Sequence, residues 1–274
     1  MSYNLLKGKR GIIFGALNSE SIAWKVAERA VEEGAQIVLT NTAVSLRLGE
    51  IKTLAEKCNA PIIAADATNI EEIEALVDKT LDYFGGKIDF VLHSIGMSPN
   101  VRKNIEYQDL NYAFLDKTLD ISALSFHKVM QVLYKKQALA EWGSIVALSY
   151  IAAQRTFVGY NDMADAKALL ESIARSFGAV FGRDFKVRVN TVSQSPTATT
   201  AGKGIKGMEG MLEFANALSP LGNADADNCA DYCITLFSDL TRKVTMQNLY
   251  HDGGFSTMGL SEEVFKAFIA GKEK

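Results

Sequence analysis

Short runs of apolar, often β-branched residues recur along this 274-residue chain and alternate with stretches of helical periodicity. Apolar residues fill successive positions in these runs, which is typical of strands covered on both faces. We expect seven strands, at residues 11–14, 37–40, 62–65, 89–93, 144–148, 187–192 and 248–251. Because helix-length segments separate them, the pattern predicts an α/β fold with a doubly wound parallel sheet and right-handed crossovers.

Two of the expected helices have clear apolar stripes. Between the first two strands the stripe consists of Ile22, Ala23, Val26, Ala27, Ala30 and Val31. Gly34 follows it, where a left-handed residue would end the helix. In a second helix, at 160–181, Ala166, Leu170, Ile173 and Phe177 form the core stripe, which leaves Tyr160, Met163 and Lys167 on another flank.

No Pro/Gly/Ser linker or internal repeat divides the chain, so we expect one domain over residues 1–274. The long irregular stretch at 194–210 contains one proline and four glycines beside several threonines. We interpret residues around 194–218 as a flexible lid over a substrate cleft, although a plain surface connection would have a similar composition.

Composition excludes some classes of protein. A net charge of -3 and a pI of about 5.7 do not favour binding to nucleic acid. The chain lacks a signal-peptide pattern and any run of about 18 apolar residues, which predicts a cytoplasmic protein without membrane insertion. An odd number of cysteines indicates a reducing compartment. Cys229 and Cys233 are one helical turn apart, and without a nearby histidine we interpret them as core residues rather than a metal or redox pair.

Candidate chemistry gathers around Tyr150, Tyr160 and Lys167. The seven residues from Tyr160 to Lys167 are two helical turns, so both side chains return to one face. A phenol and an ammonium would then share one cleft. Alone, such a pair also arises on solvated helices.

The spacing has a close parallel in one family. Most short-chain dehydrogenases place the lysine four residues after the tyrosine, where this chain has Ala164. The longer spacing resembles that of the bacterial NADH-dependent enoyl-acyl-carrier-protein reductases, a divergent branch of that superfamily. Gly15 with Ser21, Ile22 and Ala23 matches the family's first turn, and Ser94-Ile95-Gly96 its turn after the fourth strand. The resemblance runs from about residue 6 to 255 and implies a Rossmann-type fold.

A cofactor site follows from these turns. Gly15 permits close backbone approach, and Ser21 can cap a helix whose free N–H groups face a pyrophosphate. The resemblance extends the nicotinamide-dinucleotide site to Gly15, Ser21, Ile22, Thr42, Asp66, Ala67, Ser94, Ile95, Gly96, Lys167, Thr197, Ala198, Thr199, Thr200 and Ala201. Thr42 stands where an acid would favour NAD and an arginine NADP, and neither is present. We favour NADH over NADPH. We interpret His93, just before the turn, as a packed strand residue.

The resemblance also implies the reaction. Hydride would pass to the β-carbon of a trans-2-enoyl thioester, and Tyr160 would stabilise the enolate oxygen. Lys167 would hold the cofactor ribose and favour the phenolate form of the tyrosine. Tyr150 would be a second phenol in the pocket, and Ser98 a further substrate contact. An acyl carrier protein as partner and a homotetramer are also implied, and Lys203 and Lys206 could meet the acidic carrier.

Other functions stay open at this point. A short-chain reductase for a carbonyl or a coenzyme A thioester would share much of the site. A nucleotide-sensing protein without catalysis predicts loss of a catalytic side chain, and none is missing. A lysine Schiff-base enzyme would use Lys167 as a nucleophile.

Overall fold

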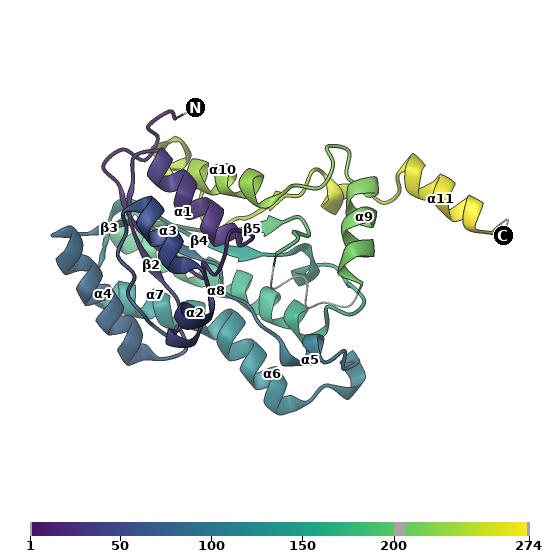
Figure 1. The fold of residues 1–274 in the computed structure, drawn as a ribbon, viewed down its shortest axis with the longest axis horizontal. Helices are drawn as coiled ribbons and strands as arrows, with labels where there is room; N and C mark the ends of the chain where they lie inside the picture. Colours follow the sequence, from purple (N-terminus) through teal and green to yellow (C-terminus); the bar gives the residue numbers. More distant parts are fainter. Residues whose placement is uncertain (1, 200–206, 273–274) are drawn as a thin grey trace.

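The computed structural model describes residues 2–199 and 207–272. They form a six-stranded parallel sheet in the order β2-β1-β3-β4-β5-β6 (Figure 1). The strands are β1 (Arg10–Phe14), β2 (Gln36–Thr40), β3 (Ile88–His93), β4 (Leu139–Ser149), β5 (Arg188–Gln194) and β6 (Asn248–His251). The expected α/β class and doubly wound parallel sheet are confirmed.

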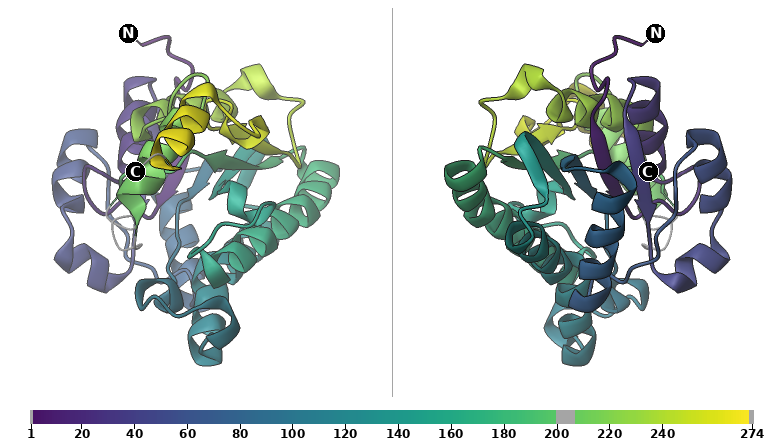
Figure 2. Two further views of the ribbon diagram at one scale, coloured as in Figure 1. Left: turned by 90° about the vertical axis from the view of Figure 1, so that its right-hand side faces the viewer. Right: turned by 90° about the vertical axis from the view of Figure 1, so that its left-hand side faces the viewer.

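Helices cover both faces of the sheet, as the two side views show (Figure 2). Apolar side chains of α1 (Ile22–Glu32), α3 (Ile51–Cys58) and α10 (Ala226–Phe237) pack on one face. Those of α4 (Ile70–Phe84), α7 (Ser125–Lys135) and α8 (Asn161–Phe185) pack on the other. Successive strand residues point to opposite faces, so Ile12 belongs to the second core and Ile13 to the first. Two buried faces explain the continuous apolar runs.

Shorter elements complete the described chain. The helices α2 (Ala43–Leu48), α5 (Pro99–Arg102), α6 (Tyr112–Leu119), α9 (Met208–Leu218) and α11 (Glu262–Lys272) lie mainly around the carboxyl ends of the strands and the C-terminus. A π-helical turn, η2 (Asp120–Leu124), joins α6 to α7, and 3₁₀ turns lie at Tyr107–Asp109, Ile151–Ala153, Asp239–Thr241 and Phe255–Thr257.

The count of seven strands is wrong. The segment at 62–65 runs beside β2 but forms only an isolated parallel bridge, between Leu39 and Ile62. Pro61 precedes it and has no N–H to extend the ladder in that direction. Ile63 and Ala65 still donate backbone hydrogen bonds to Leu39 and Asn41. The segment therefore borders the sheet without becoming a regular strand.

Helix ends follow the expected chemistry at two places. Gly34 has φ +91° directly after the C-cap of α1, as predicted for a left-handed residue. The helix predicted at 160–181 is α8, which begins at Asn161 with Tyr160 as its N-cap residue. Tyr160 therefore lies at the N-terminal end of the helix rather than within it. Part of the region predicted as a lid, residues 200–206, lies outside the described residues, and α9 occupies most of its remainder.

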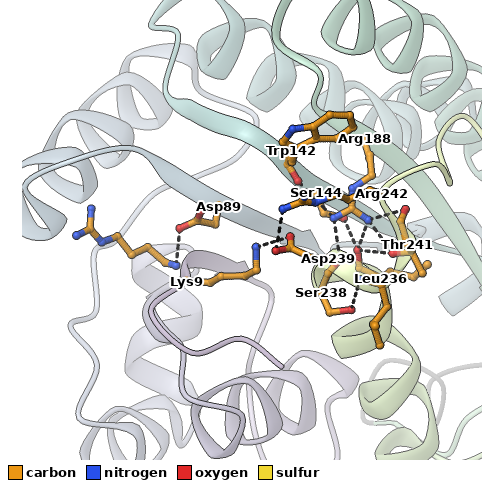
Figure 3. A network of polar contacts seen from close by, with 12 residues as sticks. Lys9, Asp89, Trp142, Ser144, Arg188, Leu236, Ser238, Asp239, Thr241 and Arg242 are labelled. Atoms are coloured by element: carbon orange, nitrogen blue, oxygen red, sulfur yellow. Dashed lines mark hydrogen bonds and ion pairs between the residues drawn. The ribbon is translucent and has the colours of Figure 1, made fainter. Parts of the chain in front are cut away.

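At the amino ends of the strands, Arg188 ties β5 to the end of α10 (Figure 3). Its guanidinium donates to the carbonyl oxygens of Leu236 (2.7 Å), Ser238 (3.2 Å) and Thr241 (3.1 Å). Burial lowers the pKa of this guanidinium to about 10. This network fixes the sheet on the side opposite the carboxyl ends, where the ligand sites of such sheets lie.

Candidate active site

A cavity of about 690 Å³ opens at the carboxyl ends of β1 to β5. The residues predicted from sequence that line it are Gly15, Ser21, Ile22, Thr42, Asp66, Ala67, Ser94, Ile95, Gly96, Ser98, Tyr150, Tyr160, Lys167, Thr197 and Thr199. Ala198 is described but is not part of the lining. Thr200 and Ala201 lie outside the described residues. The sheet reverses its winding between β1 and β3, so the turns after these strands meet at the crevice.

The turn after β1 contains the closest backbone approach in this cavity. Gly15 has φ +94°, and a Cβ added there would lie 2.0 Å from the carbonyl oxygen of Ser94. Ser21 is the N-cap residue of α1, but its side chain does not bond the helix. Its Oγ instead accepts from the backbone N–H groups of Leu17 (3.2 Å) and Asn18 (3.1 Å). The expected side-chain cap is therefore wrong, because Ser21 closes the preceding turn.

One end of the cavity lies beyond β2. Thr42 Oγ1 accepts from the N–H of Ser45 at 3.2 Å and caps α2. Asn41 fixes the turn by donating from Nδ2 to the carbonyl of Ala16 at 3.0 Å. Asp66 Oδ1 accepts from the backbone and the hydroxyl of Thr68, at 2.8 and 2.7 Å. This end therefore presents hydroxyl, amide and carboxyl groups.

Two phenols and the lysine meet at the other end. The rings of Tyr150 and Tyr160 have centroids 4.9 Å apart and an interplanar angle of 53°. Burial raises the pKa of both phenols above its ordinary value, so each keeps its proton near neutral pH. The Tyr150 hydroxyl faces the sulfur of Met211 on α9 at 3.6 Å. Since sulfur is a weak acceptor, that proton has no strong partner there.

Lys167 is a buried ammonium, and Nζ donates to the carbonyl oxygen of Leu148 at 2.7 Å. Desolvation lowers its pKa to about 8, and the carboxylate of Glu171 opposes this shift. Glu171 is itself buried and accepts from Ser149 Oγ (2.7 Å) and Gln154 Nε2 (3.0 Å). A carboxylate one helical turn behind Lys167 thus supports its charge and anchors the end of β4 next to Tyr150.

Ser98 lines the cavity, but its hydroxyl is engaged elsewhere. Oγ donates to Asp162 Oδ1 at 2.6 Å and accepts from the N–H of Val101 at 3.0 Å. The proton that could bind a substrate oxygen is therefore directed away from the cavity. A contact of Ser98 with substrate stays a prediction.

His93 and the cysteines belong to the core. His93 is buried in β3 with Nε2 2.9 Å from Ser125 Oγ, and burial lowers its pKa to about 3, so the ring is neutral. The three cysteines are buried and free. In the described ranges, no group of His, Cys, Asp and Glu could hold a metal ion.

Sequence reasoning missed Asp162, Glu171 and Met211. Glu171 follows Lys167 by four residues, so helical spacing could have identified it. Asp162 and Met211 had no comparable local signal, because their partners are distant in sequence.

The residues fit an extended dinucleotide. The missing side chain at Gly15 opens the crevice between two turns, and the N-terminus of α1 faces it with the polarity that suits a pyrophosphate. The amide of Asn41, the hydroxyl of Thr42 and the carboxyl group of Asp66 suit an adenosine, and the phenols and Lys167 lie at the opposite end.

Fold and cavity together define a Rossmann-type nucleotide-dependent oxidoreductase. Residues 15–256 match the family model described as enoyl-(acyl carrier protein) reductase, and the chain belongs to that family. It is 33% identical to enoyl-[acyl-carrier-protein] reductase [NADH] 2 of Rhizobium meliloti, over 92% of this chain and 93% of the relative.

Solved structures agree. A FabI–NADH complex from Alistipes finegoldii is 71% identical, with a TM-score of 0.95 over 96% of this chain and 93% of that one. The NADH enoyl-[acyl-carrier-protein] reductase of Aquifex aeolicus is 28% identical, with a TM-score of 0.86 over 94% of this chain and all of that one. The resemblance inferred from Tyr160 and Lys167 is confirmed. Within the described part of the chain, no helix has the length and apolar character needed to span a bilayer.

Proposed function

We propose that this chain is the NADH-dependent enoyl-acyl-carrier-protein reductase of a dissociated fatty acid synthesis system. It reduces a trans-2-enoyl thioester to the saturated acyl thioester. The observation that carries this conclusion is the cavity itself, which joins the dinucleotide turns to a buried phenol (Tyr150), a half-buried phenol (Tyr160) and a buried ammonium. The names of relatives and of a FabI–NADH complex support both the reaction and the cofactor.

When bound, NADH would supply the hydride for the β-carbon, and a proton added at the α-carbon completes the saturated product. Tyr160 donates a hydrogen bond to the thioester oxygen, where enolate charge develops. A preorganised donor of this kind is worth about 3 kcal/mol in the transition state. The raised pKa of the buried phenol supports this role, since a phenolate could not donate. The same shift does not support the earlier expectation that Lys167 favours the phenolate form.

Lys167 holds the ribose hydroxyls, and its bond to Leu148 fixes the ammonium against the end of β4. Tyr150 shapes the substrate end of the cavity, and its weak contact with Met211 leaves its hydroxyl able to turn toward substrate. Ser94 to Gly96 and Thr197 to Thr199 line the cofactor channel beside them.

The same proposal covers partners and location. An acyl carrier protein presents the thioester, α9 contributes to the lid, and a homotetramer acts in the cytoplasm. Lys203 and Lys206, suggested as carrier contacts, lie outside the described residues. Exposed Phe265, Phe268 and Ile269 on α11 support contacts between subunits. Light scattering after size-exclusion chromatography measures the oligomer.

The test is NADH oxidation with crotonyl-acyl-carrier-protein, beside crotonyl-coenzyme A, NADPH and a β-ketoacyl thioester. We expect oxidation of NADH with the enoyl substrates alone, and a fall in kcat of about 10²-fold in Tyr160→Phe with unchanged NADH binding. Oxidation with the β-ketoacyl thioester would indicate a carbonyl reductase. NADH binding without turnover of any substrate would indicate a nucleotide-sensing protein.

A further inference from the structure

A second buried carboxylate lies next to the substrate end of the cavity. Asp162 follows Tyr160 by two residues in the first turn of α8, and its side chain is completely buried. Three polar groups from other elements contact it: Ser98 Oγ at 2.6 Å, Asn100 Nδ2 at 2.8 Å and Thr118 Oγ1 at 2.8 Å. Its nearest sequence partner is 44 residues away.

Asp162 acts as a hydrogen-bond acceptor in this cluster. Ser98 Oγ already accepts from the N–H of Val101, so its one proton is directed at the carboxylate. Asn100 Oδ1 accepts from the N–H of Asn111, so the Asn100 side chain presents its amide protons to Asp162. Thr118 Oγ1 has one proton and also lies 2.8 Å from the carbonyl oxygen of Phe114, so Ser98 and Asn100 are the donors committed to the carboxyl group. The N-terminus of α8 favours negative charge at this position.

The hydrogen bonds join three parts of the cavity wall. Ser98 and Asn100 belong to the segment 97–102, of which Met97, Ser98, Val101 and Arg102 line the cavity. Thr118 is on α6, and Asn100 also holds Asn111 at the start of that helix. Val101 packs with Met163, and Tyr160 packs against that pair. Asp162 therefore connects the 97–102 wall to the helix that begins at Tyr160.

We propose that Asp162 is a positioning residue for the reduction: its carboxylate holds the 97–102 wall against the N-terminus of α8 and so shapes the acyl-binding side of the cavity. This inference rests on the proposed function. It assigns the Ser98 hydroxyl to Asp162, so any contact of Ser98 with substrate uses its backbone.

Most of the cofactor residues lie outside this cluster. The donors of Asp162 come from 98–118, whereas the turns after β1 and β2 line the nucleotide channel and Lys167 bonds Leu148. Loss of the carboxylate should therefore affect the thioester much more than NADH. A role in folding alone would change the two affinities together or neither of them.

The test is Asp162→Asn, which keeps the volume but places an amide donor among donors. We expect the KM for crotonyl-acyl-carrier-protein to rise about tenfold, the equivalent of one unsatisfied buried group, with the NADH dissociation constant within about twofold. Asp165→Asn is the matched control, since Asp165 lies on the same helix and accepts from the exposed Tyr107 hydroxyl at 3.3 and 3.4 Å. It should leave both values unchanged.

A reciprocal variant adds a rescue. In Asn100→Asp combined with Asp162→Asn, residue 100 supplies the acceptor and residue 162 the amide donor of the same hydrogen bond. This double variant should reverse part of the rise in KM. If Asp162→Asn does not fold, Thr118→Val removes a single donor, and we expect a smaller rise in KM from it.

An unchanged KM in a folded Asp162→Asn enzyme, or equal losses for thioester and NADH, would overturn the inference. The wild-type enzyme separates this failure from that of the proposed function, because absence of enoyl turnover there contradicts the function itself.

Discussion

At the scale of single residues, the titration of Lys167 makes the site sensitive to pH. Its pKa of about 8 lies below that of a free lysine because the ammonium is desolvated. If the ammonium binds the ribose, NADH affinity is constant below pH 8 and falls above it, by up to tenfold per pH unit. Glu171→Gln removes the charge that raises this pKa, so the break moves to lower pH. Measuring the NADH dissociation constant between pH 6 and 10 checks both statements.

Glu141→Gln is the control for that series. Glu141 is an exposed carboxylate paired with Lys186 near the amino end of β4. Lys167 contacts the opposite end of that strand, at Leu148. Its variant should keep the wild-type break. A break at the same pH in all three proteins would show that Lys167 does not govern binding.

At the scale of elements, the crossing of the turns after β1 and β3 has no room for a methyl group. In Gly15→Ala the new Cβ would lie 2.0 Å from the Ser94 carbonyl, at φ +94°. We expect a loss of about 2 kcal/mol in the free energy of unfolding and a weaker affinity for NADH. Gly85→Ala is the control: it ends α4 at φ +60° with open space around its Cβ, so it shows the backbone cost alone. Urea unfolding and NADH titration of both variants test this, and equal losses would exclude the clash.

At the scale of the whole molecule, the two ends of the sheet differ in role: one forms the cavity and the other stabilises the fold. The carboxyl ends carry the cavity, whereas Arg188 at the amino end of β5 binds the carbonyls that end α10. Arg188→Leu removes the charged donor from these carbonyls, of which that of Leu236 still accepts from Ser144 Oγ at 2.8 Å. We expect a loss of about 3 kcal/mol in the free energy of unfolding. In folded enzyme kcat should be unchanged, because the network lies at the far end of the sheet.

Arg242→Leu, which removes an exposed guanidinium paired with Asp239, should cost less than about 1 kcal/mol. Thermal and urea unfolding with steady-state kinetics measure these effects, and a large fall in kcat for Arg188→Leu would contradict this separation.

Local patterns explain most of what could be predicted. Strand residues such as Ile12 and Ile13 are both apolar because each sheet face carries its own helices. The turn at Gly15 and the two-turn spacing from Tyr160 to Lys167 are short-range features, and the cavity contains all three residues. The segment at 62–65 has the composition of a strand, but its edge position and Pro61 reduce its pairing to one bridge.

The sequence by itself determined the parallel α/β fold and the turns, tyrosine and lysine that line the cavity, because each depends on periodicity or on neighbours along the chain. Only the tertiary structure decided that Asp162 and Glu171 are buried. In sequence they look like the solvated charges of a helix, and their donors arrive from segments distant in the chain, such as Ser98, which lies 64 residues from Asp162. The same holds for Ser21, whose side chain closes a turn instead of capping α1. Competing hydrogen-bond partners of this kind are set by packing, which no local pattern records.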